Sequence, residues 1–145
     1  MSIDTLGQAL AIVLQTDVLI AIVLGAVYGL FIGALPGLTA TMSTALLVPV
    51  TFYMAPVPAI ALIVSSTAMA ITAGDIPGAL LRIPGTPASA AYTDESHQMT
   101  LNGKAGTALS IGFFFSALGG LLGATVLLVA GPLLARISLH FSSFE

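Results

Sequence analysis

Long apolar runs alternate with short polar or proline-rich interruptions along this chain. No charged side chain occurs from Val18 to Gly74 or from Ala105 to Ala135. A helix that crosses a membrane needs about 20 predominantly apolar residues. The first run therefore has room for two crossings or more, and the second has room for one long crossing. We predict spans over residues 18–35, 59–73 and 107–134.

The segments around these spans differ in character. Residues 4–16 are mildly amphipathic and are expected to form an interfacial helix. Asp17 is predicted to be the N-cap of the first span, and Pro36-Gly37 is predicted to end that span. Residues 39–54 are apolar but contain Pro49, which favours an interrupted or re-entrant element. Residues 94–106, DESHQMTLNGKAG, are the hydrophilic stretch of the chain and are expected to form a loop.

Composition places the chain in the membrane class. It is 57% hydrophobic and 6% charged, whereas soluble domains carry about 25% charged residues. We therefore predict an all-α integral membrane protein, with a single membrane domain over residues 1–145 and three to five membrane segments. The absence of cysteine excludes disulfides and thiolate metal sites. A net charge of −3 argues against nucleic acid as a partner, and three basic residues leave the membrane orientation open.

Two stripes of small residues repeat every four positions. The first consists of Gly25, Gly29, Gly33 and Gly37, and the second of Gly112, Ser116, Gly120 and Ala124. Small residues at this spacing let helix backbones approach closely in lipid. We expect tight packing within one bundle, and a homodimer face is the alternative.

Two interruptions share one pattern. In GALPGLTATMST, residues 33–44, and IPGTPAS, residues 83–89, proline and glycine end one element and hydroxyl residues open the next. Thr86 suits an N-cap and Pro87 the first helical position, which would leave the N–H groups of residues 88–90 unpaired. Such backbone is tolerated at membrane depth only when it is buried in protein or lines a wet cavity. The alternative is a proline kink whose hydroxyls bond to the preceding turn.

A helix start carries partial positive charge, so two broken or re-entrant helices predict an anion site that needs no lysine. Main-chain N–H groups and hydroxyls would hold the substrate. The predicted substrate-binding residues are Pro36, Gly37, Thr39, Thr41, Ser43, Arg82, Gly85, Thr86, Pro87 and Ser89.

Asp75 and Arg82 are the only charges from Val18 to Thr93. Charges inside a membrane are costly and are read as functional by default. In one interpretation Asp75 binds a coupling cation and Arg82 neutralises a substrate carboxylate; in the other the two form a mutual salt bridge at the membrane edge. Four hydroxyls would line a cation path in the first case, although such groups more often bond to their own helix: Ser65, Ser66, Thr67 and Thr72.

No catalytic constellation is present in the sequence. Asp94, Glu95 and His97 lie close together, but a metal site needs more convergent ligands, so these side chains are expected to be solvated. There is no nucleophile–base pair, phosphate loop or pair of intramembrane carboxylates. We therefore expect a protein that is not an enzyme, with no catalytic residue, bound metal or organic cofactor.

Three segments occur in a familiar order: GALPGLTATMSTALLVPVTF, then LLRIPGTPASAAYT, then NGKAGTALSIGFFFSALGGLLGA. From about Gly25 to its end the chain resembles the large membrane subunit of the tripartite tricarboxylate transporters, the TctA family. The resemblance implies a multi-pass symporter of the bacterial inner membrane that takes up citrate or related carboxylates, driven by sodium or protons. It also implies two protein partners, a periplasmic solute-binding protein and a small membrane subunit.

The family's large subunit is considerably longer, so this chain is expected to match its N-terminal part, as a fragment or as a truncated relative. Asp75 and Arg82 depart from the family's pattern, as does Glu95-Ser-His-Gln-Met99 after the second interruption. These departures leave the exact substrate open: it is either a different carboxylate or a smaller anion. Two rival functions remain: a non-transporting membrane scaffold or anchor that assembles through the glycine stripes, and a channel.

Overall fold

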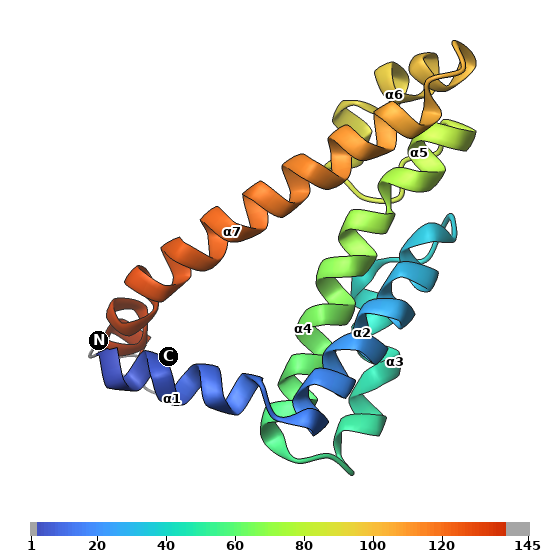
Figure 1. Ribbon diagram of the computed structural model, residues 1–145. Helices are drawn as coiled ribbons and strands as arrows, with labels where there is room; N and C mark the ends of the chain where they lie inside the picture. Colours follow the sequence, from blue (N-terminus) through green and yellow to red (C-terminus); the bar gives the residue numbers. More distant parts are fainter. Residues whose placement is uncertain (1–2, 139–145) are drawn as a thin grey trace. The chain divides into compact units, whose positions relative to one another are not determined.

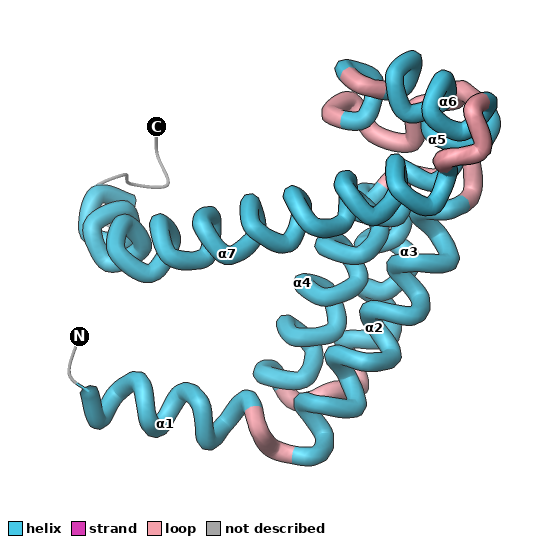
Figure 2. The backbone as a smooth tube through the Cα atoms, turned by 45° about the horizontal axis from the view of Figure 1, so that its top comes forward, coloured by secondary structure: helices cyan, strands magenta, loops and turns pink. Residues whose placement is uncertain are grey.

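The computed structural model describes residues 3–138 and is helical in its regular elements over that range (Figures 1 and 2). The helices are α1 (Ile3–Val13), α2 (Thr16–Ala34), α3 (Ala40–Thr51), α4 (Pro56–Ala73), α5 (Asp75–Leu81), α6 (Thr93–Leu101) and α7 (Ala105–Ser138), with a 3-10 turn η1 (Ser89–Ala91) before α6. Three stretches are long and apolar enough to cross a membrane: Thr16–Ala34, Pro56–Leu81 and Ala105–Gly131. The predicted fold class, an all-α integral membrane protein, is confirmed.

The chain divides into two compact units, residues 1–109 and 110–145. The first holds α1 to α6, and the second consists mainly of α7. Within the first unit, α2, α3 and α4 lie side by side, and α1 leaves the start of α2 at a steep angle (Figures 1 and 2). The interfacial position of α1 and the single membrane domain stay predictions.

The backbones of α2 and α4 are in direct contact. A Cβ atom on Gly25 would meet the carbonyl of Leu62, and one on Gly29 or Gly33 would meet the backbone of a residue 37 positions later, Ser66 or Ala70. The constant offset shows that the two helices run parallel and in register. Glycines at four-residue spacing permit this approach because they carry no side chain. Tight packing within the bundle is therefore confirmed for three members of the first stripe.

The other stripe residues behave differently. Gly37 has a φ of +90° and nothing within 4 Å of an added Cβ, so it serves a turn rather than the helix contact. Gly120 on α7 also has no neighbour within 4 Å of an added Cβ. The role of the second stripe therefore stays a prediction.

Helix α3 returns along α4 in the opposite direction. Ser43 contacts Ser66, and Leu47, one turn further along α3, joins the apolar cluster that contains Leu62, one turn earlier on α4. With 12 residues, α3 is roughly 18 Å long, which is too short to cross a hydrocarbon core of about 30 Å. This short length fits the predicted re-entrant element, whose place in the membrane stays a prediction, and Pro49 does not interrupt the helix. Pro49 removes one intrahelical hydrogen bond, the one that an N–H would donate to the Ala45 carbonyl, and the helix ends two residues later at Thr51.

Several predicted boundaries were wrong for identifiable reasons. Gln15, not Asp17, is the N-cap of α2, and Asp17 lies in the first turn, where its charge favours the helix dipole. The second span starts earlier, with Pro56 at the first helical position, and continues past Gly74 to Leu81. The last span, predicted over residues 107–134, belongs to the longer helix α7, which starts at Ala105 and continues to Ser138.

Much of the predicted hydrophilic loop is helix α6. Its first turn carries Asp94 and Glu95, which stabilise a helix start. Gly103, with a φ of +75°, lies just beyond its last residue, as is typical of helix ends. The polar composition indicated exposure correctly but did not distinguish a loop from a helix.

Because α2 and α4 are in backbone contact, we predict that adding one methyl group between them lowers the stability of the protein. Gly29→Ala places a Cβ against the backbone of Ser66, and overpacking of this kind costs about 1–3 kcal/mol. Gly7→Ala is the matched control because nothing lies within 4 Å of its added Cβ. Thermal unfolding in detergent should show a lower Tm for Gly29→Ala and an unchanged or slightly higher Tm for Gly7→Ala, since alanine favours a helix interior over glycine. Equal Tm values would contradict the backbone contact.

Candidate functional site

The two interruptions, residues 33–44 and 83–89, are called the first and the second break. The first break has the geometry that the sequence predicts. Helix α2 ends at Ala34, and Gly37 adopts a left-handed φ that glycine tolerates best. Thr39 then caps α3, its Oγ1 accepting the Met42 N–H at 3.2 Å. The N–H groups of Ala40 and Thr41 have no acceptor within their own helix, because they belong to its first turn. The side chain of Thr41 is exposed at this helix start.

Ser43 does not face the open break. Its side chain is fully buried, and its hydroxyl lies 2.8 Å from that of Ser66 on α4. The neighbouring hydroxyls of Thr44 and Thr67 are 3.0 Å apart. Ser43 thus joins two helices, which favours a structural role for this predicted substrate ligand.

The four hydroxyls considered for a cation path divide into two groups. Ser65, Thr67 and Thr72 donate to carbonyls of α4 itself, at 2.8 to 2.9 Å. Ser66 is the exception, because its partner is Ser43 on α3. The interpretation that these hydroxyls bond to their own helix therefore holds for three of the four.

The second break folds back onto the helix that precedes it. Arg82 ends α5 with a left-handed φ of 60°, and its N–H donates to the Gly78 carbonyl at 3.1 Å. Further along, the Gly85 N–H donates to the Gly74 carbonyl at 3.2 Å. A Cβ on Gly85 would come within 2.6 Å of that same oxygen, so this close approach requires glycine.

Thr86 and Ser89 are joined by reciprocal hydrogen bonds. Each donates its N–H to the other's hydroxyl at 3.0 Å, and the Ala90 N–H donates to the Thr86 carbonyl at 3.2 Å. The Thr86 hydroxyl accepts the Ser89 N–H, but the predicted N-cap position was wrong, because the 3-10 turn starts at Ser89 with Ala88 as its N-cap; the N–H groups of Ser89 and Ala90 are therefore not free. This reciprocal pairing resembles a capping box, in which the side chain three residues on returns to the cap. The turn that follows is only three residues long.

Asp75 and Arg82 do not pair with each other. The Arg82 Nε lies 2.8 Å from Oδ1 of Asp94, and both side chains are largely exposed. Asp75 is 7% exposed, and its Oδ1 accepts the Tyr92 hydroxyl at 2.6 Å. The predicted mutual salt bridge is therefore wrong, because the second break brings each charge a different partner.

The ion pair between Arg82 and Asp94 shifts the pKa of both side chains. Asp94 raises the pKa of Arg82, first by its hydrogen bond and then by its charge, and Arg82 lowers the pKa of Asp94 in the same way. A lowered carboxyl pKa stabilises the fold above the ordinary carboxyl range, and this stabilisation is lost as the pH falls through the lowered value. Solvent screening keeps the contribution of such an exposed pair small.

Tyr92 is a residue that sequence reasoning missed. It follows η1 and is the donor to Asp75. Burial raises its pKa above the usual range, and the hydrogen bond to Asp75 raises it further. The other oxygen of Asp75, Oδ2, is buried and has no hydrogen-bond partner among the described residues.

The acidic residues and histidine after the second break belong to α6. His97 Nδ1 lies 3.1 Å from the Ala79 carbonyl, which ties α6 to α5. Within residues 3–138, no group of three or more histidine, cysteine, aspartate or glutamate side chains is arranged to hold a metal ion.

Both breaks lie at the same end of the α2–α4 pair. Gly33, near the end of α2, packs on Ala70, and Gly85 packs on Gly74. Four helical residues separate Ala70 from Gly74, a rise of roughly 6 Å. The α2–α4 register places Ala34, the last residue of α2, about one helical turn before Asp75.

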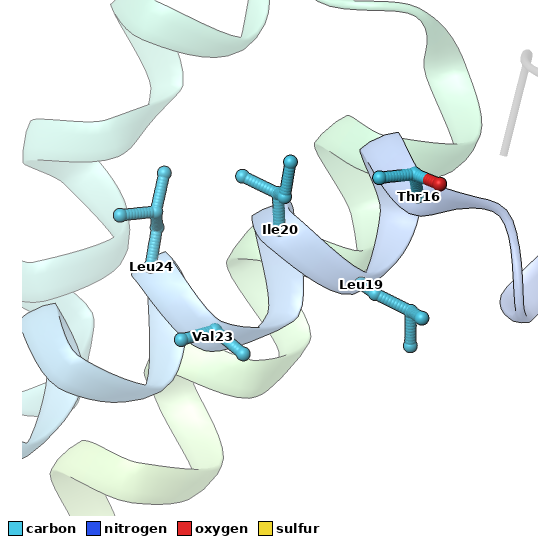
Figure 3. Close-up of a pocket in the computed structure, with 5 residues that line it drawn as sticks. All are labelled: Thr16, Leu19, Ile20, Val23 and Leu24. Atoms are coloured by element: carbon cyan, nitrogen blue, oxygen red, sulfur yellow. The ribbon is translucent and has the colours of Figure 1, made fainter.

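A hollow of about 280 Å³ lies elsewhere, against the N-terminal half of α2 (Figure 3). Its lining residues are Thr16, Leu19, Ile20, Val23 and Leu24. All come from one helix and four are aliphatic, so the hollow offers little to a carboxylate. None of the predicted site residues lines it.

Over residues 19–145 the chain matches the tripartite tricarboxylate transporter TctA family. The chain belongs to this family. The resemblance noted in the sequence is confirmed, and TctA is a family of transporters. A relative from Agrobacterium vitis, named "Uncharacterized 52.8 kDa protein in TAR-I ttuC' 3'region", is 31% identical over 121 residues, which cover 83% of this chain and 24% of the relative. The TctA chain thus spans about a quarter of that relative's length. No solved structure matches it.

The buried serine pair gives a prediction that separates structure from binding. Ser66→Ala leaves the Ser43 hydroxyl buried without its partner, at a cost of about 1 kcal/mol in a membrane protein. Adding Ser43→Ala should cost no more, since neither hydroxyl is then left unpaired. Thermal unfolding of the two single variants and the double variant measures the coupling. Additive losses in stability would contradict the pairing.

Proposed function

We propose that this TctA chain forms part of the membrane pathway of a cation-coupled carboxylate transporter. The observation that carries the proposal is the position of both helix breaks at one end of the α2–α4 pair, in a chain of a transporter family. Broken helices with exposed starts are where transporters bind anionic substrates. The proposed substrate is citrate or a similar tricarboxylate.

The anion would be held mainly at the start of α3. The N–H groups of Ala40 and Thr41, with the hydroxyls of Thr39 and Thr41, are the donors of this helix start. Arg82 would supply a positive charge from the second break, because a single bond from Nε to Asp94 leaves other N–H donors of its guanidinium. Gly85, Thr86, Pro87 and Ser89 would shape the second wall rather than donate free N–H groups.

The proposed transport is symport with sodium or protons, and Asp75 is the proposed cation-binding residue. A periplasmic solute-binding protein would deliver the carboxylate, and a small membrane subunit would complete the assembly. The proposed location is the inner membrane of a bacterium. A charged residue buried among apolar helices supports a role in coupling.

The scaffold alternative loses one of its supports. Gly25, Gly29 and Gly33 pack against α4 of the same chain, so this stripe is not free to bind a second protein. Only the stripe on α7 remains for such a role.

Uptake by the assembled transporter in lipid vesicles tests the proposal. With its binding protein supplied, labelled citrate should accumulate against its gradient, and the accumulation should require an inward sodium or proton gradient. Flux that only equilibrates citrate would indicate a channel. Absence of flux for citrate and for other carboxylates would leave the scaffold function.

Thr41→Val tests the start of α3 as the anion site. It removes an exposed hydroxyl at the proposed site with little change in volume, and a hydrogen bond to a charged group contributes about 1.5–3 kcal/mol. The KM for citrate should rise about 10- to 100-fold. Thr51→Val at the other end of α3 is the matched control, because Thr51 bonds only the Val48 carbonyl. Equal KM values for the two variants would refute the site.

A further inference from the structure

The junction between α4 and α5 contains an incompletely bonded carboxyl group. Asp75 is 7% exposed, and its Oδ1 accepts the Tyr92 hydroxyl at 2.6 Å. Oδ2 is buried, with no hydrogen-bond partner in the described part of the chain. Native proteins rarely leave such an atom unpaired, and each exception calls for an explanation. An oxygen atom in this state has lone pairs available for one further ligand.

No positive side chain of the described residues neutralises this carboxyl. Arg82, beyond the end of α5, is paired with Asp94 on α6. The other ionisable groups of α6 are Glu95 and His97, and the His97 ring is engaged with the Ala79 carbonyl. Neither α4 nor η1 carries an ionisable residue.

Helix α2, which also packs near α5, offers no cation either. Its ionisable residues are Asp17, in its first turn, and Tyr28, which packs on the apolar cluster of Ala21, Leu47 and Leu62. The polar partner of the Asp75 carboxyl is thus a neutral phenol. An isolated carboxylate in apolar surroundings is strongly disfavoured, and protonation is the usual way in which it is neutralised.

The number of available oxygen atoms distinguishes a metal ion from a proton. A hard metal cation takes several oxygen ligands, commonly six or more. At Asp75, Oδ1 already accepts the Tyr92 hydroxyl, and Oδ2 has no hydrogen-bond partner among the described residues. A proton needs only one oxygen atom. The arrangement therefore suits a proton, and among the described residues no group of three or more histidine, cysteine, aspartate or glutamate side chains gathers around a metal ion.

We propose that Oδ2 of Asp75 binds and releases the coupling proton while the Tyr92 hydroxyl holds Oδ1. The inference rests on the proposed transport function and assigns its coupling ion. Binding forms one O–H bond on Oδ2 and neutralises the carboxylate; release returns the proton to water and restores the negative charge.

Tyr92 connects this proton to the second break. Its hydrogen bond to Oδ1 is strong when the carboxyl is charged and weaker when it is neutral. The residues from Ile83 to Tyr92 fold back onto Gly74 and Asp75, so the proton loosens one of the bonds that hold this segment. Because α2 ends about one helical turn before the level of Asp75, proton and anion would bind at the same end of the α2–α4 pair.

Asp75→Asn, an uncharged side chain of the same shape, tests the site in the assembled transporter. In vesicles, an inward proton gradient should drive citrate accumulation by the wild type and not by Asp75→Asn. Exchange of internal for external citrate, which needs no net proton movement, should persist in the variant and shows that it is folded. Asp17→Asn, an exposed aspartate at the far end of α2, should retain gradient-driven accumulation.

Tyr92→Phe tests the positioning role of the hydroxyl. The Tyr92 hydrogen bond favours the charged carboxyl, so its loss should shift the pH profile of uptake to higher pH. A merely structural role would lower uptake at every pH without moving the profile. An unmoved profile would overturn the role of Tyr92.

Three further results would overturn the proton site. Gradient-driven accumulation by Asp75→Asn would do so, as would wild-type uptake that follows a sodium gradient and ignores the proton gradient. Infrared difference spectra provide a readout without transport: the wild type should show a pH-dependent carboxylic-acid band that Asp75→Asn lacks, and its absence would also exclude the site. If the wild type accumulates no carboxylate at all, the proposed function fails. With uptake present, the other results reject the proton site alone.

Discussion

The structure depends on a backbone contact between two helices. Three glycines of α2 expose their backbone to α4, and each added Cβ would collide with the α4 backbone. This contact aligns α2 and α4 in parallel with a fixed register. Two parallel neighbours need a return connection, and α3 provides it as a half-length helix fixed to α4 by the Ser43–Ser66 hydroxyl pair. The end of α2 is thereby level with the α4–α5 junction, and both breaks follow at one end of the pair.

The arrangement gives the two breaks different tasks. At the first break, Thr39 caps a 12-residue helix whose next N–H groups have no partner within that helix. At the second break, the N–H groups of Thr86 and Ser89 each donate to the other residue's hydroxyl. These N–H groups are not available to a substrate, so the segment is better suited to a structural role. It also supplies Tyr92 to the buried Asp75 and brings Arg82 to Asp94. The start of α3 is therefore the stronger candidate for the anion, and the second break for coupling.

Local sequence patterns predicted the elements but not the pairings between them. Four-residue glycine spacing indicated close helix contact, and Pro36-Gly37 followed by Thr39 indicated a helix end and a new start. By contrast, Tyr92 lies 17 positions from Asp75 in the sequence, Asp94 lies 12 positions from Arg82, and Ser66 lies 23 positions from Ser43. Those pairs depend on how the chain folds back, which no helical periodicity encodes. Helix α6 was missed because its residues are polar, although Asp94 and Glu95 are favourable at a helix start.

The common end of the two breaks is tested most directly by distances between spin labels in the assembled transporter. The chain has no cysteine of its own, so introduced pairs within it are unique. One pair combines Ala88→Cys with Thr41→Cys at the start of α3, and the other combines Ala88→Cys with Tyr53→Cys beyond its end. The first distance should be the shorter, by up to the length of α3, roughly 18 Å. Equal distances, or a shorter distance to residue 53, would show that the two breaks do not lie at the same end.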